Sequence, residues 1–107
     1  MTMISHVYVL IRTDIPRAQQ LVQACHATFE MGLDLARQHR DPAHLVALAV
    51  PDKDILLNEA DRLRATGIRH RMFFEPDDQL GFTALATEPL EAERRVHLRH
   101  LPLWTPA

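Results

Sequence analysis

Residues 6–32 read HVYVLIRTDIPRAQQLVQACHATFEMG, and this stretch decides the fold. Residues 6–12 form a nearly continuous run of β-branched, aromatic and aliphatic side chains, which is typical of a strand buried on both faces. Residues 13–16 then interrupt the run. Proline is tolerated in the first turn of a helix and disfavours helix in the residue before it, so we expect a helix to begin at about Pro16.

A helix is predicted over residues 17–39, because apolar residues recur there at spacings of three and four. Residues 40–42 are expected to end it. The apolar residues form one face, which we expect to pack into the core. This face consists of Ala18, Leu21, Val22, Cys25, Phe29, Leu33 and Ala36. Cys25 is therefore predicted to be a small core residue rather than a nucleophile.

Strands and helices alternate along the rest of the chain. The predicted elements are, in order, a strand at 45–50, a helix at 55–63, strands at 69–74 and 82–87, and a helix at 89–100. Asp52 is a candidate N-cap of the second helix, and Gly67 a candidate C-terminal cap. The order β-α-β-α-β-β-α predicts a layered α/β domain with a mixed sheet, because helical crossovers make strands parallel and a short turn allows an antiparallel pair.

Length and composition fit one globular domain over residues 1–107, with 47% hydrophobic and 24% charged residues. No apolar run approaches the roughly 18 residues of a membrane-spanning helix, and the first ten residues lack the features of a secretory signal. A single cysteine excludes an internal disulfide and favours a reducing, cytoplasmic location. The net charge of −2 argues against a nucleic-acid coat protein.

The short motifs of well-known enzyme families are missing. The chain has no phosphate loop, no dinucleotide glycine fingerprint, no nucleophile elbow and no His-Glu-x-x-His pair. His97 and His100 lie three residues apart on the last predicted helix and could bind a metal from one face. No third ligand follows at a recognisable spacing, so we expect no metal site and interpret this segment as a solvated basic face.

A polar stripe follows the edge of the apolar face on the first helix. It consists of Gln19, Gln23, His26 and Glu30, spaced by four, three and four residues. One interpretation is a boundary stripe half covered by the next element. The other is the polar wall of an active-site groove, in which His26 would exchange a proton and the glutamines would orient a substrate or water.

Three charged residues, Arg12, Asp14 and Arg17, lie at the end of the first strand and the start of its helix. Ligands of open α/β sheets tend to bind outside the carboxyl ends of strands, and a helix N-terminus favours anions. These residues are therefore candidates for binding a substrate phosphate. The alternative is a surface pair between Arg12 and Asp14 that contributes little energy.

Residues 7–32 resemble the start of type 2 peptidyl-tRNA hydrolases. That family opens with a hydrophobic strand ending in Arg-Thr-Asp, found here at residues 12–14, and a helix with Gln-x-x-His-Ala, found here at 23–27. Residues 44–75 and the closing strand FTALATEP, residues 82–89, also match in order and spacing. The likeness covers nearly the whole chain and looks closest to the divergent peptidyl-tRNA hydrolase domain-containing proteins.

The resemblance implies a three-layer α/β/α domain with a four-stranded mixed sheet, a homodimer, and no cofactor. It also implies cleavage of the ester that joins a peptide to the 3′ ribose of tRNA. Gln19 stands where the family has a lysine, Glu75 takes the place of an aspartate, and Thr83 keeps one threonine. The candidate catalytic residues are His26, Glu75 and Thr83, and the candidate substrate-binding residues are Arg12, Asp14, Arg17, Gln19 and Gln23.

Ester hydrolysis needs an oriented water, a base and stabilisation of the oxyanion. His26 or Glu75 could serve as the base, and Arg17, Gln19 or backbone amides could stabilise the oxyanion. The leading hypothesis is a peptidyl-tRNA hydrolase-like protein that acts in translation on peptidyl-tRNA or aminoacyl-tRNA with an altered active site. The alternatives are a catalytically inactive family member that binds RNA or protein, and a small regulatory domain that senses a ligand.

Overall fold

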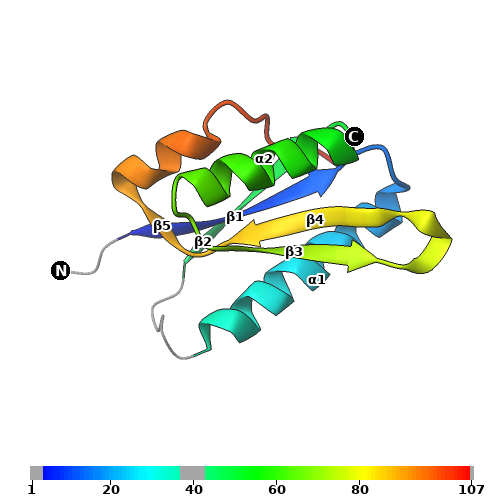
Figure 1. The fold of residues 1–107 in the computed structure, drawn as a ribbon, viewed down its shortest axis with the longest axis horizontal. Coiled ribbons are helices and arrows are strands. Elements are labelled where there is room, and N and C mark those ends of the chain that lie inside the picture. The colour runs from blue at the N-terminus through cyan, green and yellow to red at the C-terminus, as the bar shows by residue number, and fades with distance from the viewer. Residues whose placement is uncertain (1–3, 37–42, 107) are drawn as a thin grey trace.

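The computed structural model describes residues 4–36 and 43–106. Its elements are β1 (Ser5–Arg12), α1 (Arg17–Leu35), β2 (His44–Val50), α2 (Lys53–Ala65), β3 (His70–Glu75), the 3-10 helix η1 (Asp77–Gln79), β4 (Gly81–Thr87), β5 (Leu90–Glu91) and the 3-10 helix η2 (Ala92–Leu98). The sheet has the order β2-β1-β4-β3, and β5 pairs with the start of β1 (Figure 1). β1 and β2 are parallel, whereas β4 is antiparallel to β1 and β3. The predicted α/β class with a mixed sheet is confirmed.

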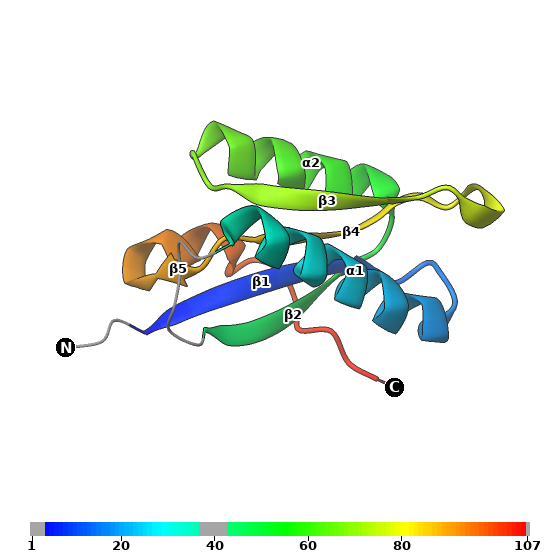
Figure 2. The same cartoon turned by 90° about the horizontal axis from the view of Figure 1, so that it is seen from below.

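The two α-helices lie on opposite faces of the sheet (Figure 2). Tyr8 and Leu10 of β1 belong to the core cluster beneath α2, whereas Val9 and Ile11 belong to the cluster beneath α1. Successive side chains of a strand point to opposite faces, so a strand covered on both sides needs an unbroken apolar run. In the described part of the chain, no helix is long and apolar enough to cross a membrane.

Helix α2 follows the sequence pattern closely. The Asp52 side chain accepts a hydrogen bond of 2.9 Å from the backbone N–H of Ile55, as expected of an N-cap. Leu56 and Leu63 are buried, and the outward positions are polar. Gly67 has a φ of +74°, a backbone conformation that favours glycine, so the predicted cap is confirmed.

Helix α1 buries the face opposite to the one predicted from the sequence. Its buried residues are Gln20, Gln23, Ala27 and Met31, while most of the predicted apolar face points outward. Cys25 is exposed, so its prediction as a core residue was wrong. The reason lies in tertiary contacts. Alanines of β4 pack against this helix, Gln20 binds the Ile15 carbonyl of the preceding loop and the Trp104 indole of the tail, and Gln23 binds Thr83 of β4. The predicted continuation to residue 39 lies partly outside the described residues.

The predicted last helix was also wrong in type and extent. Leu90 is buried in β5, Ala92 has a φ of +35°, and the chain then forms η2 instead of an α-helix over residues 89–100. The tail beyond it lies along the edge of β2: Ala49 N–H donates to Pro102 O at 2.9 Å, and Trp104 N–H to Ala47 O at 2.8 Å. The tail therefore protects much of an edge strand that would otherwise expose its hydrogen-bonding groups.

His6 creates a pH-sensitive point at the start of the sheet. Its ring stacks on that of His44, its partner across the parallel strands, with centroids 5.1 Å apart. Its Nδ1 atom is buried without a hydrogen-bond partner among the described residues. Burial, followed by the positive charges of Arg95 and His44, lowers the pKa of His6 below its usual value of 6.5.

Stability is therefore expected to fall as the pH drops from 7 to 5. The unfolded chain takes up a proton at His6 before the folded chain does, so the contribution is complete above about pH 6.5 and is lost below it. Urea denaturation of the wild type and His6→Phe at pH 8, 7, 6 and 5 measures this, since phenylalanine keeps a ring but does not titrate. The wild type should lose stability relative to the variant as the pH falls. A difference that stays constant with pH would contradict the assignment to His6.

Candidate functional site

A hydrogen-bonded network centred on Gln23 joins α1 to the two strands beneath it. Gln23 is fully buried, and its Oε1 accepts a hydrogen bond of 2.7 Å from the hydroxyl of Thr83. Its Nε2 donates to Glu75 Oε1 at 3.1 Å and to Gln19 Oε1, also at 3.1 Å. Four of the candidate residues from the sequence thus lie together on one side of the sheet. We call Gln19, Gln23, Glu75 and Thr83 the glutamine network.

The sheet brings the network together from distant parts of the chain. Glu75 is the last residue of β3 and pairs with Gly81 at the start of β4, two residues before Thr83. A register irregularity between Phe73 and Phe74 shifts the end of β3. Gln23 reaches both strands because α1 packs against them with its polar side inward. The two interpretations of the polar stripe each describe part of it: Gln23 is covered, whereas Gln19 and Glu75 are only partly buried.

His26 lies beside the network and does not join it. Its ring stacks on Phe73 of β3 with a centroid distance of 4.3 Å and an angle of 3° between the planes. The side chain is exposed, and within the described residues it makes no hydrogen bond. His26 follows Gln23 by three residues on α1. Because its ring stacks flat on Phe73, the ring nitrogens remain available to a bound molecule.

Arg12 fixes the turn that follows Glu75. Its Nε and Nη2 donate to the two carboxylate oxygens of Asp14 at 2.8 and 3.0 Å, and its Nη1 donates to Leu80 O at 2.6 Å and to Phe82 O at 2.9 Å. Four of its five N–H groups are thereby engaged. The Arg12 side chain is 10% exposed, so the pair is not the weak surface contact considered from the sequence. Protein groups, rather than an external phosphate, occupy this guanidinium.

The contact with Arg12 also governs the charge of Asp14. The hydrogen bonds from Arg12 hold the pKa of the Asp14 carboxyl below its usual value of 3.8, and burial opposes them only in part. Asp14 therefore remains a fixed negative charge that orients Arg12 throughout the physiological range.

Arg17, at the exposed start of α1, donates hydrogen bonds to the carbonyl oxygens of Thr105 and Pro106 in the tail. Gln20, one turn further, was not singled out from the sequence. Its Nε2 donates to Ile15 O at 2.8 Å, and its Oε1 accepts from Trp104 Nε1 at 2.7 Å. Gln20 lies three residues before Gln23 and therefore on the same face of the helix. This spacing is the sequence signal that could have identified Gln20 as a site residue.

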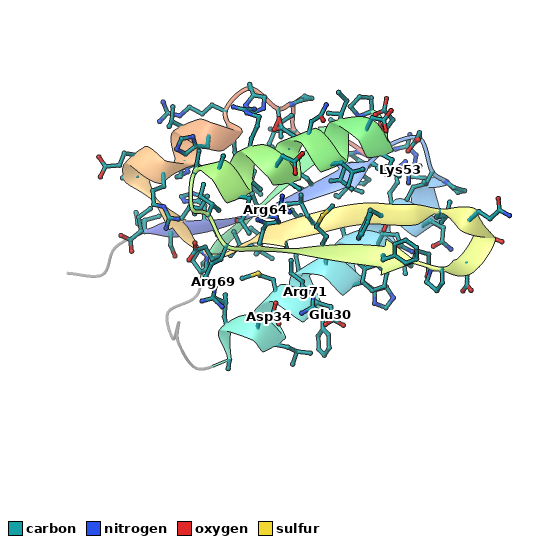
Figure 3. The ribbon with its side chains drawn as sticks, in the orientation of Figure 1. Glu30, Asp34, Lys53, Arg64, Arg69 and Arg71 are labelled. Atoms are coloured by element: carbon teal, nitrogen blue, oxygen red, sulfur yellow. The ribbon has the colours of Figure 1, made fainter. Side chains whose placement is uncertain are left out.

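Lys53, the only lysine of the chain, lies close to the start of β4. Its Cδ is 3.8 Å from the position that a Cβ would occupy on Gly81. It is the first residue of α2, so it approaches Gly81 from the sheet face opposite α1 (Figure 3). The four residues of the glutamine network include no cation.

The predicted basic face near the C-terminus is largely occupied by internal contacts. Arg94 pairs with Glu88 at 3.1 Å, and Arg95 donates to the hydroxyl of Tyr8 at 2.8 Å. His100 contacts the buried carboxylate of Glu59, which also binds Arg62. These groups connect η2 and its end to the sheet and α2, so much of this expected solvated face has a structural role.

Neither a protein-family model nor a curated protein sequence matches this chain. A solved structure that is similar belongs to Atu0240, a protein of unknown function from Agrobacterium tumefaciens strain C58. The TM-score is 0.73 at 12% sequence identity, and the match covers 97% of this chain and 100% of that chain. At this identity the likeness concerns the fold, and the two proteins share an α/β architecture.

Proposed function

We propose that this protein hydrolyses the ester between a peptidyl or aminoacyl group and tRNA, with the glutamine network as the reactive site. The observation that carries the proposal is the position of Glu75. Gln23 holds one carboxylate oxygen, Oε1, while Oε2 has no hydrogen-bond partner among the described residues. A half-buried carboxylate with one oxygen held and the other open can orient a water molecule as a general base.

The remaining parts have complementary roles in this reaction. Gln19 accepts from Gln23 through Oε1, which leaves its NH₂ group to donate to an oxyanion. Thr83 holds Gln23 in place from beneath and acts as a positioning residue. Glu75 removes a proton from water as the water oxygen bonds to the acyl carbon. The ester C–O bond then breaks, and the proton passes to the departing 3′ oxygen of tRNA, directly or through His26.

The proposal is tested by single-turnover hydrolysis of a peptidyl-tRNA. Glu75→Gln should lower the rate of the chemical step by about 100-fold or more, the usual effect of losing a general base, while substrate binding is retained. Glutamine can still accept from Gln23, so the network should stay folded. Glu93→Gln, an exposed substitution in η2, is the matched control and should keep full activity.

A second candidate is a catalytically inactive protein that binds RNA, favoured by the neutral Gln19 at the position of the family's lysine. It predicts that wild type, Glu75→Gln and His26→Ala hydrolyse the substrate equally, at the uncatalysed rate. Binding of tRNA should then weaken as salt rises, by a power set by the number of phosphates contacted. Equal rates in all three proteins would overturn the hydrolase proposal.

A further inference from the structure

The two edges of the sheet differ in how their backbone groups are satisfied. At the β2 edge, Ala49 N–H donates to the tail and Trp104 N–H of the tail donates back, at 2.9 and 2.8 Å. β3 is the outermost strand on the other side of the sheet (Figure 1). Apart from its pairing with β4, the backbone of residues 70–75 makes no hydrogen bond to the described part of the chain. Because antiparallel pairing uses alternate residues, the others direct their N–H and C=O groups away from the sheet. We call this outer side of β3 the β3 edge.

The β3 edge lacks the features by which natural edge strands resist pairing. β3 reads HRMFFE and contains no lysine or proline. Its one arginine, Arg71, is engaged by Glu30 and Asp34 of α1, with N–O distances of 3.4 and 2.8 Å (Figure 3). The extra residue at the register irregularity is Thr83 of β4, which has no partner opposite it, so β3 itself keeps a regular alternation. A strand of this kind can accept a further strand.

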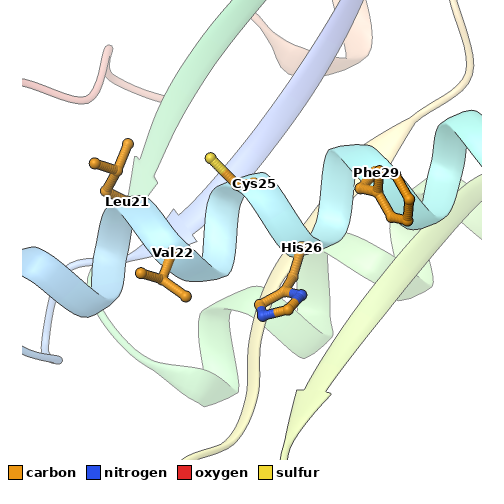
Figure 4. A pocket seen from close by; sticks show the side chains of 5 residues that line it. All are labelled: Leu21, Val22, Cys25, His26 and Phe29. Atoms are coloured by element: carbon orange, nitrogen blue, oxygen red, sulfur yellow. The ribbon is translucent and has the colours of Figure 1, made fainter.

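A strand added to β3 would meet apolar surface on both faces of the sheet. On the α1 face, the ring of His26, which stacks on Phe73, borders a hollow of about 520 Å³. The other side chains that line this hollow are Leu21, Val22, Cys25 and Phe29 (Figure 4). On the α2 face, Phe74 is 55% exposed and packs edge-on against Phe82, with ring centroids 5.1 Å apart. Side chains of a strand alternate between the two faces, so one added strand can cover both surfaces.

We propose that the β3 edge binds an extended peptide segment of a partner protein, which adds to the sheet as a further strand. This inference goes beyond the proposed hydrolase activity and does not depend on it. The occupant is an extended backbone, because only an extended backbone supplies donors and acceptors at the spacing of the unpaired groups of β3. Its central side chains are apolar, since they cover Phe74 on one face and the hollow beside Phe73 on the other. The tail already covers part of the β2 edge through backbone hydrogen bonds of the same kind.

The charges at the end of β3 define the partner further. Glu75 ends the strand, and Asp77 and Asp78, both exposed, follow it in η1. Lys53 approaches Gly81, the partner of Glu75 in the sheet, so its charge offsets one of these three. The surface at this end therefore remains negative, and complementary charge favours a basic residue in the bound segment beside it. We expect a segment that is apolar at its centre and carries lysine or arginine at one end.

The test uses a fluorescent peptide of the order Lys-Val-Thr-Phe-Thr-Val-Lys, in which either strand direction places a lysine beside Glu75. Its fluorescence anisotropy should rise on titration with the wild-type protein, with a dissociation constant on the order of 10–100 µM, because the ordering of a flexible peptide offsets much of the gain from a short strand. The same peptide methylated on its central backbone nitrogens cannot donate hydrogen bonds and should bind at least tenfold more weakly. Hydrogen exchange of alternate amides in residues 70–75, followed by NMR, should slow when the unmethylated peptide is bound.

Phe74→Lys is the variant that should close the β3 edge, because lysine removes the apolar contact and places a charge on the strand. It should weaken peptide binding at least tenfold while retaining the circular dichroism spectrum, since Phe74 is largely exposed. Leu45→Lys is the matched control. Leu45 is 71% exposed on β2, the opposite edge strand, so this variant should bind the peptide as the wild type does.

Three results would overturn the proposal. The first is no rise in anisotropy at about 1 mM protein, a concentration well above the expected dissociation constant. The second is equal binding of the methylated peptide, or exchange protection in β2 instead of β3. The third is protection of residues 70–75 in the free protein that grows with its concentration, which would show that a second copy of the chain occupies the β3 edge.

Discussion

Arg12→Met is expected to lower the free energy of unfolding by about 3 kcal/mol. Methionine fills a similar volume but leaves the Asp14 carboxylate and the carbonyl oxygens of Leu80 and Phe82 without their donor. The loss of stability is large because only 10% of the Arg12 side chain is exposed. Water therefore has little access to the oxygen atoms that lose their hydrogen-bond donor. Urea denaturation at pH 7 measures the loss.

Arg64→Met is the matched control for this effect. Arg64 also pairs with an aspartate, Asp61, at 2.9 Å, but the two side chains are 67% and 70% exposed. Exposed pairs contribute at most about 1 kcal/mol, so this substitution should change stability little. Similar losses in the two variants would show that the burial of Arg12 and its contacts to the turn are energetically unimportant.

The same substitution connects stability with the proposed chemistry. Arg12 holds both ends of the segment that leads from Glu75 into β4, through Leu80 and Phe82. Loss of these bonds should release the turn and reduce hydrolysis even where the protein remains folded. Arg12 would thus act through the position of Glu75 and not through contact with the substrate, which differs from the substrate-binding role predicted for it.

The local patterns of the sequence predicted most of the sheet because burial on both faces leaves a clear signal. The apolar runs at residues 6–12 and 45–50 correspond to β1 and β2, and the Asp52 and Gly67 caps delimit α2. Such features depend on neighbours within a few residues, so a single sequence contains the information that specifies them.

The orientation of α1 could not be predicted in this way. Periodicity identified a face with Leu21, Val22 and Phe29, and an apolar face normally turns inward. The groups that reverse this preference come from elsewhere: the Thr83 hydroxyl, 60 residues from Gln23, and the Trp104 indole, 84 residues from Gln20. Two buried amides are tolerated because these partners satisfy them, and no local pattern reveals such partners.

In the candidate site, too, the sequence predicted which residues lie together but did not predict the contacts between distant elements. The resemblance and the stripe pointed to Gln19, Gln23, Glu75 and Thr83, which the fold brings together. The contacts of Arg12 with the turn and of Gln20 with the tail depend on side-chain packing between elements far apart in the chain. Spacing could have singled out Gln20, but the partners of Arg12 and Gln20 do not follow from residue type and spacing.

The largest effect is expected for Gln23→Glu, which should lower the free energy of unfolding by about 3–4 kcal/mol at pH 8 and by about 1 kcal/mol at pH 5. The new carboxyl would be fully buried beside Glu75, since Gln23 has no exposed surface and lies 3.1 Å from Glu75 Oε1. Burial and the neighbouring carboxylate would both raise the pKa of the introduced group, by about 2–3 units. Because the pKa of the introduced glutamate is higher in the folded state, the variant keeps its stability below the pKa of the unfolded chain, about 4.3. It loses stability as the pH rises from there towards the pKa of the folded protein.

Denaturation of Gln23→Glu and wild type between pH 4 and 8 distinguishes this charge effect from a change in packing, because the two side chains have nearly the same shape. Gln79→Glu, an exposed substitution in η1, should show little difference from wild type at any pH in this range. A loss for Gln23→Glu that is the same at pH 5 and pH 8 would mean that position 23 is open to water. The network could then not hold one oxygen of Glu75 in a fixed orientation, so this stability measurement also tests the geometry on which the proposed general base depends.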